Sequence, residues 1–443
     1  MVGTTAAPFA LTHATIVTGD RDGTVLPDHT VTVAADGTIA AVEPSPANPV
    51  ALPQRQIDLT GKYLVPGLIN AHAHLFSDGR PLPSVFAKES LEGAVTLFFR
   101  SPAGKALLRR RTRENALTQL HSGVTTIRSV GDVGYEVVTL RDRIDAGELV
   151  GPRLLPSGPL LAVSGGHGAP LIALVGDDPW EARRNVRLNL RKGVGAIKIS
   201  ATGGVTDARA IGEAGRPQMT EAEMAAICDE AHNAEIVVAA HAQSREGTLR
   251  ALRAGVDTIE HGCDLDDELV ALFNDNPRSL FGTSAMVPTF SAALPIVKLS
   301  QSVTGVDDVV RANGELILER MIQGTRDALA GGVALGSGSD SALTYVTHYN
   351  MWRELDFATR FGGLTPARAL NSATQENARI LGIADRTGSI EPGRSADLVV
   401  LPANPLEDFR AFAELELVVV SGSVIEQPAV ARFDEIDAYL DSF

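Results

Sequence analysis

Eight short apolar runs recur along the middle of the chain, and amphipathic stretches separate most of them. Alternation of strand-like and helix-like segments is typical of parallel strands joined by crossover helices. Eight such units are the number that closes a barrel. We therefore expect an α/β fold with a (β/α)8 TIM barrel over residues 63–381, and an open doubly wound sheet is the alternative. The runs are LVPGLINAHAH, GVTTIRSV, GPRLLPSG, GAIKISA, EIVVAAHA, DTIEHG, FGTSAMVPTF and VALGSGSD.

Helix-start signals occur between and after these runs. Thr220 and Glu223 have capping-box spacing at the start of TEAEMAAICDEAHN. Thr365-Pro366 places a proline at the first position of a later helix. The basic run RRRTR that begins at Arg109 lies in another helical stretch. Because such charge runs usually face solvent, we interpret it as part of the outer surface.

The two ends of the chain differ in texture from its middle. ATIVTG and HTVTVAADGTIAAVEP alternate apolar and polar residues, and Asp36-Gly37 is a strong hairpin-turn signal. GSIEPGRSADLVVLPANP and ELVVVSGSVI repeat this texture near the C-terminus. We therefore expect residues 1–62 and 382–443 to form one small β-sandwich domain together.

Composition narrows the partners and the location of the chain. A net charge of −15 would repel nucleic acid, so a small-molecule partner is expected instead. The two cysteines, Cys228 and Cys263, make a disulfide framework implausible. Neither a secretory signal nor a membrane-length apolar run is present. These features predict a cytoplasmic protein without a membrane partner.

Residues with metal-binding side chains lie at or near the C-terminal ends of the runs. His72 and His74 end the first run at positions i and i+2, so both would face one side of a strand. Barrel enzymes place their active sites at the C-terminal strand ends. Imidazole and carboxylate ligands suit zinc or a similar divalent ion. We therefore predict a metal site at this face, where six residues meet: His72, His74, Lys198, His241, His261 and Asp340.

Each of these residues alone has an ordinary structural explanation. An isolated His-x-His pair is more often exposed or hydrogen-bonded than metal-bound. Lys198 alone would be read as a barrel-wall lysine or half of an ion pair, and Asp340 alone as a turn or helix-cap residue. Their joint placement in barrel order favours the metal site.

Five motifs give the chain a family resemblance. GLINAHAHL, IKISATGGV, HAQS, IEHG and GSDS resemble the amidohydrolase superfamily, above all its imidazolonepropionase-related and prolidase-like, Xaa-Pro dipeptidase-type branch. The resemblance extends over nearly the whole chain: TPARALNSATQENARILGI resembles the segment before the closing sheet, and GSIEPGRSADLVVL and NPLEDF resemble that sheet. It implies a metal-dependent amidohydrolase, an enzyme acting on C–N bonds.

The resemblance also implies a ligand arrangement. Lys198 would be carboxylated by carbon dioxide and bridge two divalent ions, with zinc as the expected metal. His72, His74 and Asp340 would bind the buried ion, whereas His241 and His261 would bind the more exposed one. Imidazolonepropionases work with one metal and without this lysine, so Lys198 favours the two-metal branch.

The expected reaction follows from these roles. A metal-bridging hydroxide attacks the substrate carbonyl, and Asp340 passes its proton to the leaving amine as general base and then acid. The expected substrate is a dipeptide or an N-acyl amino acid. A lactone, a carbamate or a cyclic amide is the alternative on the same site, and a non-catalytic hydantoinase-like scaffold is less favoured. Relatives commonly assemble, so a homo-oligomer is a further expectation.

Candidate substrate contacts are less strongly marked. His167, in SGGHG, resembles a glycine-histidine motif of the prolidase-like branch, which implies a substrate or transition-state contact; an ordinary loop histidine is the alternative. Arg128 would either meet a substrate carboxylate or pair with Asp132. The remaining candidates are Gly203 and Gly204, which would let backbone approach the substrate, and Tyr345, which would line the pocket.

The sequence departs from the family pattern at two positions. Asn70 stands where many relatives carry aspartate before the His-x-His pair, which affects how the histidines are oriented. Met219 stands at a substrate-binding position where prolidase-like relatives often carry an aromatic residue. This leaves the anchor of a substrate carboxylate open among Arg128, Arg209 and Arg216.

Overall fold

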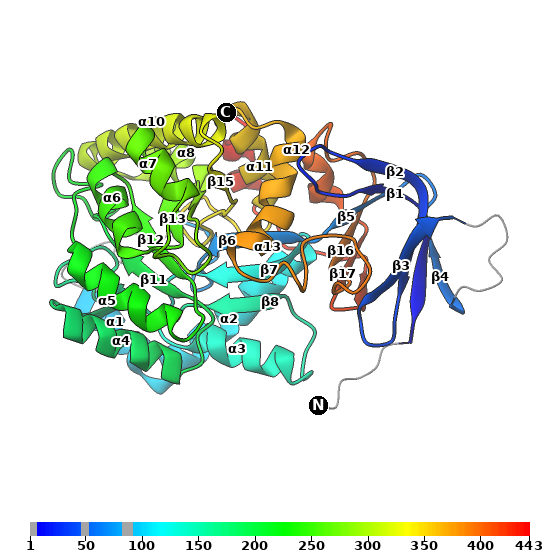
Figure 1. The fold of residues 1–443 in the computed structure, drawn as a ribbon, viewed down its shortest axis with the longest axis horizontal. Helices are drawn as coiled ribbons and strands as arrows, with labels where there is room; N and C mark the ends of the chain where they lie inside the picture. Colours follow the sequence, from blue (N-terminus) through cyan, green and yellow to red (C-terminus); the bar gives the residue numbers. More distant parts are fainter. Residues whose placement is uncertain (1–6, 46–52, 82–91) are drawn as a thin grey trace.

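A barrel of parallel strands and a flanking β-domain make up the molecule (Figure 1). The computed structural model describes residues 7–45, 53–81 and 92–443. Within these residues the barrel strands coincide with the eight apolar runs of the sequence. In chain order they are β6 (Leu68–Ala73), β7 (Val124–Ser129), β8 (Arg153–Pro156), β11 (Ile197–Ser200), β12 (Val238–Ala242), β13 (Thr258–His261), β14 (Ala285–Val287) and β15 (Ala334–Leu335).

Backbone hydrogen bonds close the strands into a ring. The ladders β6-β7-β8 and β11-β12-β13-β14-β15 are parallel. The amide of Asp340 donates to the carbonyl of His72 at 2.8 Å, and that of Ala71 donates to Ser337 at 3.1 Å, which joins the last strand to the first. The (β/α)8 barrel is confirmed, and the open doubly wound sheet is wrong.

The third strand of the barrel is interrupted. β8 is followed by the short β9 (Leu160–Ala162), which pairs with β11 where Leu161 meets Ile199. β10 (Ala173–Val175) adds a parallel strand to the outer side of β9. β9 continues the third strand after β8, so the loop between β9 and β10 begins at the C-terminal end of the barrel.

Helices follow the strands and cover the outside of the barrel (Figure 1). The residues of β6, β7 and β11 are all buried, as expected for parallel strands covered on both faces. The helices are α1 (Glu92–Arg100), α2 (Pro102–His121), α3 (Glu136–Asp145), α4 (Pro179–Arg191), α5 (Glu221–His232), α6 (Arg245–Ala254), α7 (Asp267–Asn274), α8 (Phe290–Lys298), α9 (Gln301–Thr304), α10 (Asp308–Ala330), α11 (Met351–Arg360), α12 (Pro366–Ser372) and α13 (Gln375–Ile380).

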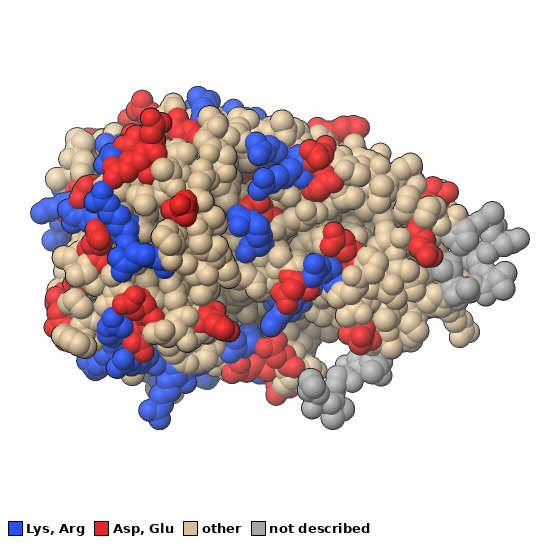
Figure 2. Space-filling model, in the orientation of Figure 1, with Lys and Arg blue, Asp and Glu red and all other residues tan. Residues whose placement is uncertain are grey.

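The predicted helix starts are confirmed. The Thr220 hydroxyl accepts from the Glu223 amide at 3.2 Å, and the Glu223 carboxylate accepts from the Thr220 amide at 2.7 Å. Thr365 caps α12 by accepting from the Arg368 amide. Arg109 of the basic run is exposed on α2. Figure 2 shows basic and acidic side chains interspersed over the barrel on this face.

Both chain ends contribute to one sheet, ordered β18-β17-β16-β5-β1-β2-β3, with β4 beside β1. β5 joins the two ends, because it runs parallel to β1 and antiparallel to β16. The strands are β1 (Phe9–Val17), β2 (Val25–Val33), β3 (Ile39–Pro44), β4 (Arg55–Asp58), β5 (Tyr63–Pro66), β16 (Leu398–Leu401), β17 (Leu417–Val420) and β18 (Ser423–Glu426). The sheet therefore reaches beyond position 62.

Alternation along β16 explains how this sheet packs on both faces. Leu398 and Val400 belong to the core of the terminal domain, whereas Val399 and Leu401 belong to the barrel core. Successive side chains of a strand point to opposite faces, so one short strand serves both cores. The β-sandwich formed from both chain ends is confirmed.

Close packing between the two chain ends also fixes the predicted hairpin turn. Gly37 lies between β2 and β3 with φ of +84°. A Cβ at this position would lie 2.4 Å from the Ser421 carbonyl oxygen. Glycine is therefore required both by the left-handed backbone and by the contact with the C-terminal segment.

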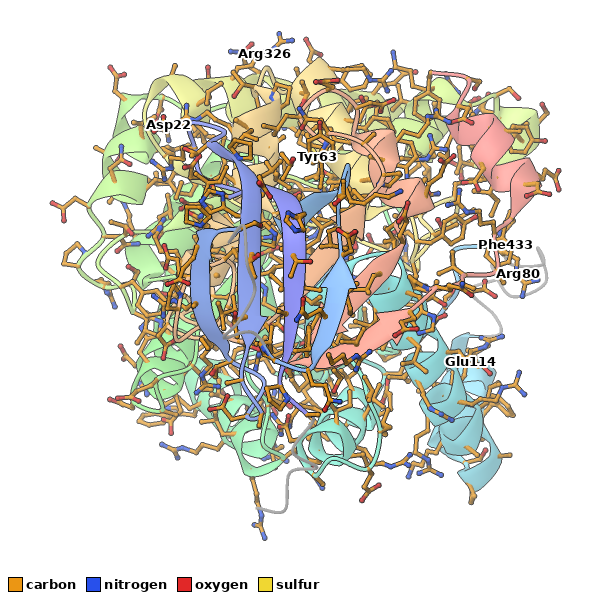
Figure 3. The ribbon with its side chains drawn as sticks, turned by 90° about the vertical axis from the view of Figure 1, so that its right-hand side faces the viewer. Asp22, Tyr63, Arg80, Glu114, Arg326 and Phe433 are labelled. Atoms are coloured by element: carbon orange, nitrogen blue, oxygen red, sulfur yellow. The ribbon has the colours of Figure 1, made fainter. Side chains whose placement is uncertain are left out.

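The C-terminal segment leaves the sheet and returns to the barrel. After the 3-10 helix η3 (Phe409–Glu414) and β18, α14 (Asp434–Leu440) packs Ile436 and Leu440 against Tyr345. Phe433 lies beside Arg80 (Figure 3), whose guanidinium is 5.1 Å from the ring centroid. No helix in the described part of the chain has the length and hydropathy needed to cross a membrane.

Candidate active site

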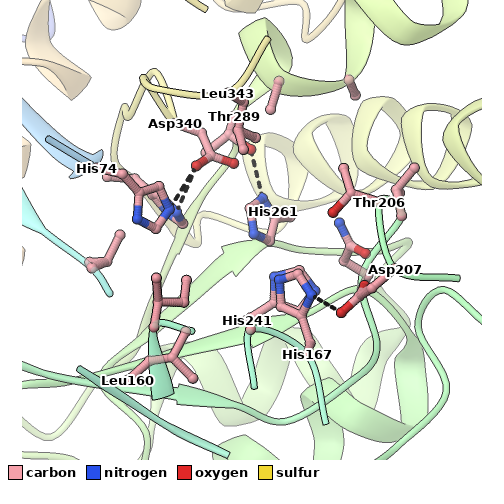
Figure 4. Close-up of a pocket in the computed structure, with 18 of the residues that line it drawn as sticks. His74, Leu160, His167, Thr206, Asp207, His241, His261, Thr289, Asp340 and Leu343 are labelled. Atoms are coloured by element: carbon pink, nitrogen blue, oxygen red, sulfur yellow. Dashed lines mark hydrogen bonds and ion pairs between the residues drawn. The ribbon is translucent and has the colours of Figure 1, made fainter. Parts of the chain in front are cut away.

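A cavity of about 320 Å³ opens at the C-terminal ends of the barrel strands (Figure 4). The barrel topology brings residues from five strand ends to this place, because all parallel strands end on the same face. The structure gathers all six predicted metal ligands in its lining: His72, His74, Lys198, His241, His261 and Asp340.

The Asp340 carboxylate lies between the two imidazoles of the first strand. Its Oδ1 is 3.4 Å from His72 Nε2 and 3.2 Å from His74 Nε2. Burial opposes ionisation, but the imidazoles outweigh it and hold the pKa of the Asp340 carboxyl well below its usual range. The i and i+2 spacing therefore does place both histidines on one side of the strand, facing an ionised carboxylate.

His261 and His241 complete the cluster from β13 and β12. The imidazole of His261 has a ligand atom within 4.8 Å of those of His72 and Asp340, so these three form a candidate metal group among the described residues. The ring of His241 lies 4.5 Å from that of His261. Burial lowers the pKa of both imidazoles well below the usual value. They are therefore neutral at pH 7, which is the form that binds metal.

Hydrogen bonds to the other ring nitrogens orient these imidazoles. His72 Nδ1 donates to Glu260 at 2.6 Å, and His74 Nδ1 donates to the Gly131 carbonyl at 2.9 Å. His261 Nδ1 lies 2.7 Å from the Thr289 hydroxyl. In each case Nε2 is left as the atom available to a metal. Partners of this kind fix the ring orientation in metal sites.

Two residues of the site have a strained backbone conformation. His261 and Asp340 have φ of +68° and +55°, a region that residues other than glycine seldom occupy. Such strain costs about 1–3 kcal/mol per residue and persists where the surrounding structure enforces it. His261 ends β13 and Asp340 lies in the segment after β15, and both side chains line the cavity.

Lys198 enters the cavity from β11. Its side chain is buried, and its Nζ has no hydrogen-bond partner among the described residues. Burial lowers the pKa of this amine to about 8, although Glu260 and Asp340 oppose the shift. A buried amine without a partner is costly. The Lys198 amine is thus suited to a covalent modification that removes its positive charge.

Arg128 does not contact the cavity, which corrects both expectations for it. It is fully buried inside the barrel, where it donates to Glu260 Oε1 at 2.7 Å, Thr258 at 2.9 Å and the Ala71 carbonyl at 2.6 Å. Asp132 instead accepts from Ser129 and the Gly158 amide. Arg128 therefore neutralises Glu260, the carboxylate that orients His72, and neither binds substrate nor pairs with Asp132.

Replacing Arg128 with methionine is expected to lower the free energy of unfolding by about 3–5 kcal/mol, because the buried Glu260 carboxylate loses its cation. Chemical denaturation of the metal-free protein measures this change. The double variant Arg128→Met, Glu260→Gln is the control and should recover part of the loss. A loss below about 1 kcal/mol in the single variant would contradict an ionised Glu260.

His167 is held at the cavity wall by four contacts. Its Nδ1 lies 2.8 Å from the Asp207 carboxylate, and its ring centroid is 4.2 Å from that of His241. Gln218 accepts from its amide, and Ser200 donates to its carbonyl. These contacts place the His167 ring in the cavity lining, next to His241.

The two glycines after β11 support histidines. A Cβ on Gly204 would lie 2.4 Å from the His167 ring, and the carbonyl of Gly203 is 3.3 Å from His241 Nε2. These glycines therefore let the backbone approach the imidazoles of His167 and His241 closely. Both glycines also line a separate polar hollow beside the cavity.

Two other candidates lie outside the cavity, which corrects their expected substrate contacts. Met219, directly before the helix cap at Thr220, is buried in the barrel core. Tyr345 packs against Tyr439, and its hydroxyl donates to the Val303 carbonyl at 2.6 Å.

The two alternative arginine anchors also lie away from the cavity lining. Arg216 is exposed, and Arg209 lines the adjoining polar hollow. Asn70, in contrast, serves the site directly: its side chain accepts from the His72 and Ser339 amides and donates to Gln119. Asparagine can make both kinds of bond at once, which an ionised aspartate cannot.

Sequence reasoning missed three residues that the structure places around the site. Glu260 orients His72, Asp207 contacts His167, and Thr289 contacts His261. A glutamate inside a predicted strand and directly before the predicted ligand His261 was a signal that could have identified Glu260. No local signal marks Asp207 or Thr289, because their partners are distant in the sequence.

Comparison with known proteins identifies the family. The protein-family model described as the amidohydrolase family matches residues 63–425. This chain belongs to the amidohydrolase family. It is thus a hydrolase acting on C–N bonds, and the family is generally metal-dependent, in keeping with the His72, His261 and Asp340 group.

Three individual proteins show what this amidohydrolase is similar to. A candidate prolidase from Bifidobacterium longum is 49% identical, with a TM-score of 0.87 and 98% of each chain covered. A Xaa-Pro dipeptidase with methionine bound in its active site is 27% identical, with a TM-score of 0.80, covering 95% of this chain and 100% of that one. The ochratoxinase of Aspergillus niger is 26% identical over 84% of this chain and 77% of its own length.

Proposed function

We propose that this amidohydrolase is a two-metal enzyme that cleaves the amide bond of a dipeptide or an N-acyl amino acid. The proposal rests on one observation. Asp340 and Lys198 meet the imidazoles of four buried histidines in one cavity. These histidines are His72, His74, His241 and His261. The proposal is also supported by the named relatives, a candidate prolidase, a Xaa-Pro dipeptidase and an ochratoxinase, which are similar to this chain in structure or sequence.

The residues present fit two divalent ions, with zinc as the proposed metal. Lys198 Nζ is buried and makes no hydrogen bond to the described residues, and Asp340 Oδ1 faces the Nε2 atoms of His72 and His74, which would bind the same ion. Carboxylation of Lys198 would convert an isolated buried amine into a two-oxygen ligand. With that group, the chain supplies four imidazoles and two acidic ligands, a set suited to zinc.

Two ions held by these residues would supply an activated water at neutral pH and polarise the substrate carbonyl. Asp340 is ionised and next to the imidazoles, so it can accept the proton of the attacking water. The same carboxyl then donates that proton to the departing amine nitrogen. Glu260 and Thr289 keep His72 and His261 oriented throughout.

His167 is proposed to contact the substrate during the reaction. It lines the cavity but belongs to the loop between β9 and β10, outside the six proposed ligands. Asp207 holds the ring from the solvent side at 2.8 Å. An imidazole fixed this way can hydrogen-bond the substrate oxygen as charge develops on it.

Amine release from a set of dipeptides and N-acyl amino acids tests this function, with zinc- or manganese-loaded enzyme and added bicarbonate. Hydrolysis of a subset is the expected result. Bound metal, measured on the same sample, should approach two ions per chain, and fewer than one would contradict the two-metal site. Metal-replete enzyme that leaves every amide intact but hydrolyses a lactone, carbamate or cyclic amide would replace the proposed substrate class.

A further inference from the structure

Apolar side chains from two opposite sides of the barrel line the cavity. In an eight-stranded barrel the third and seventh strands face each other across the axis. Here the third position is taken by β8 and β9, and the seventh by β14. The segments that follow these strands therefore form facing walls, with the histidine cluster between them.

The wall after the seventh strand is built from α8 and α10. It presents small residues next to larger aliphatic ones, which leaves room between them for a bulky group. Gly314 is necessary to this shape, because a Cβ there would lie 2.9 Å from the Ile296 side chain. The wall residues are Ala292, Ala293, Ile296, Gly314, Ile317 and Met321.

The facing wall comes from the loops after the first three strands. In the view of Figure 4, Leu160 of β9 lies on the opposite side of His241 and His261 from Thr289, the N-cap residue of α8. The other apolar members of this wall are Phe76, Val130, Leu171 and Ile172.

Charged groups in the cavity are few and already engaged. Of the described lining residues, Lys198 is the one lysine or arginine, and it belongs to the proposed metal site. The acids are Asp340, which faces the imidazoles, and Asp207, which holds His167. A charged substituent buried against the apolar walls would lose its hydration without gaining an ion pair with a lysine or arginine of the described lining.

From these two walls we propose that substrates are recognised by a bulky apolar group on each side of the scissile amide, without an ionic anchor for a carboxylate. This inference rests on the proposed amide hydrolysis and names its substrate class: N-acyl amino acids with a large apolar acyl group and an apolar side chain. Each large group would add to transition-state binding through apolar burial.

A matched substrate series tests the inference with metal-loaded enzyme. The series is N-acetylglycine, N-acetylleucine, N-phenylacetylglycine, N-phenylacetylleucine and N-phenylacetylglutamate, plus the N-methylamide of N-phenylacetylleucine. We expect kcat/KM to rise about tenfold or more for each apolar group added, as burial of a leucine-sized or phenyl group allows. Glutamate in place of leucine should remove that gain, and blocking the carboxylate should change kcat/KM less than tenfold.

A wall substitution links the preference to the structure. Ala292→Phe should lower the ratio of kcat/KM for N-phenylacetylleucine over N-acetylleucine about tenfold or more. The reason is that the ring of the introduced phenylalanine fills the space beside Ile296 that the acyl group of the substrate would occupy. Ala222→Phe, at an exposed position of α5 outside the cavity, is the matched control. Should Ala292→Phe fail to fold, Ile296→Ala widens the same wall and should raise the relative kcat/KM of acyl groups larger than phenylacetyl.

The outcomes separate the two proposals. Equal kcat/KM across the series, a preference for glutamate, or a loss above tenfold on blocking the carboxylate would overturn the apolar recognition while leaving amide hydrolysis intact. Failure to release amine from any member by enzyme that holds its metal would instead overturn the proposed function.

Discussion

Replacing Asp340 with asparagine is expected to lower kcat by about 10²–10⁴-fold, the usual contribution of a positioned general base and acid. The asparagine side chain keeps an oxygen at 3.2–3.4 Å from the two imidazoles but can no longer accept a proton. Because one ligand oxygen and all four imidazoles remain, much of the bound metal should be retained. Amine release and metal content, measured on the same preparation, check both parts.

The matched control for this variant is Asp385→Asn, which removes one negative charge from an exposed turn far along the chain from the site. It should leave kcat and metal content at wild-type values. Near-wild-type turnover in Asp340→Asn would remove Asp340 from the proton transfer. Loss of the metal together with turnover would show that its main role is that of a ligand.

Replacing Lys198 with methionine is expected to affect metal binding and stability in opposite directions. Metal content should fall to one ion or fewer per chain, with turnover lost, because the proposed bridging ligand is gone. The metal-free protein should become more stable by about 1–3 kcal/mol at neutral pH, since a buried amine without a hydrogen-bond partner is replaced by an apolar chain of similar length.

The pH dependence of unfolding provides the second readout for Lys198. Burial lowers the pKa of this amine to about 8 in the folded protein, below its ordinary value in the unfolded chain. The unfolded chain therefore binds more protons between about pH 8 and about pH 10.4, and stability of the metal-free wild type should rise through that window. Below about pH 8 the amine destabilises the fold by about 3 kcal/mol.

Urea denaturation at a series of pH values, on chelator-treated protein, compares wild type with Lys198→Met. The variant should lack the stability increase above about pH 8. Parallel curves would mean that solvent reaches the Lys198 amine. Full metal content in Lys198→Met would overturn the proposed ligand role whatever the stability result. Lys192→Met, which removes an exposed lysine at the end of α4, controls for the loss of one positive charge.

The amino-acid sequence by itself determined the architecture and the residues that meet in the cavity. Eight apolar runs became eight parallel strands, because buried parallel strands need continuous apolar segments. Residues at their C-terminal ends then had to meet on one face, which is why His72 and Asp340 could be placed together across most of the chain length. The helix starts at Thr220 and Thr365 could also be predicted, because each capping signal lies within a few neighbouring residues.

Only the tertiary structure decided what each polar residue near these ends contacts. Arg128 follows the same strand-end pattern as the ligands, yet it turns into the barrel interior and pairs with Glu260. Met219 packs into the core, and Tyr345 faces α14. The sequence shows which strand end a residue occupies, but the direction of its side chain depends on strand tilt and on neighbours from other strands.

The shape of the cavity was likewise a tertiary property. Its apolar walls come from helices and loops that follow opposite strands, and Asp207 reaches His167 from a different loop. Contacts of this kind join residues far apart in the sequence without leaving a periodic pattern in it. The six residues that line the cavity together could be predicted because strand ends converge by topology, whereas the apolar walls depend on how the loops and helices pack above them.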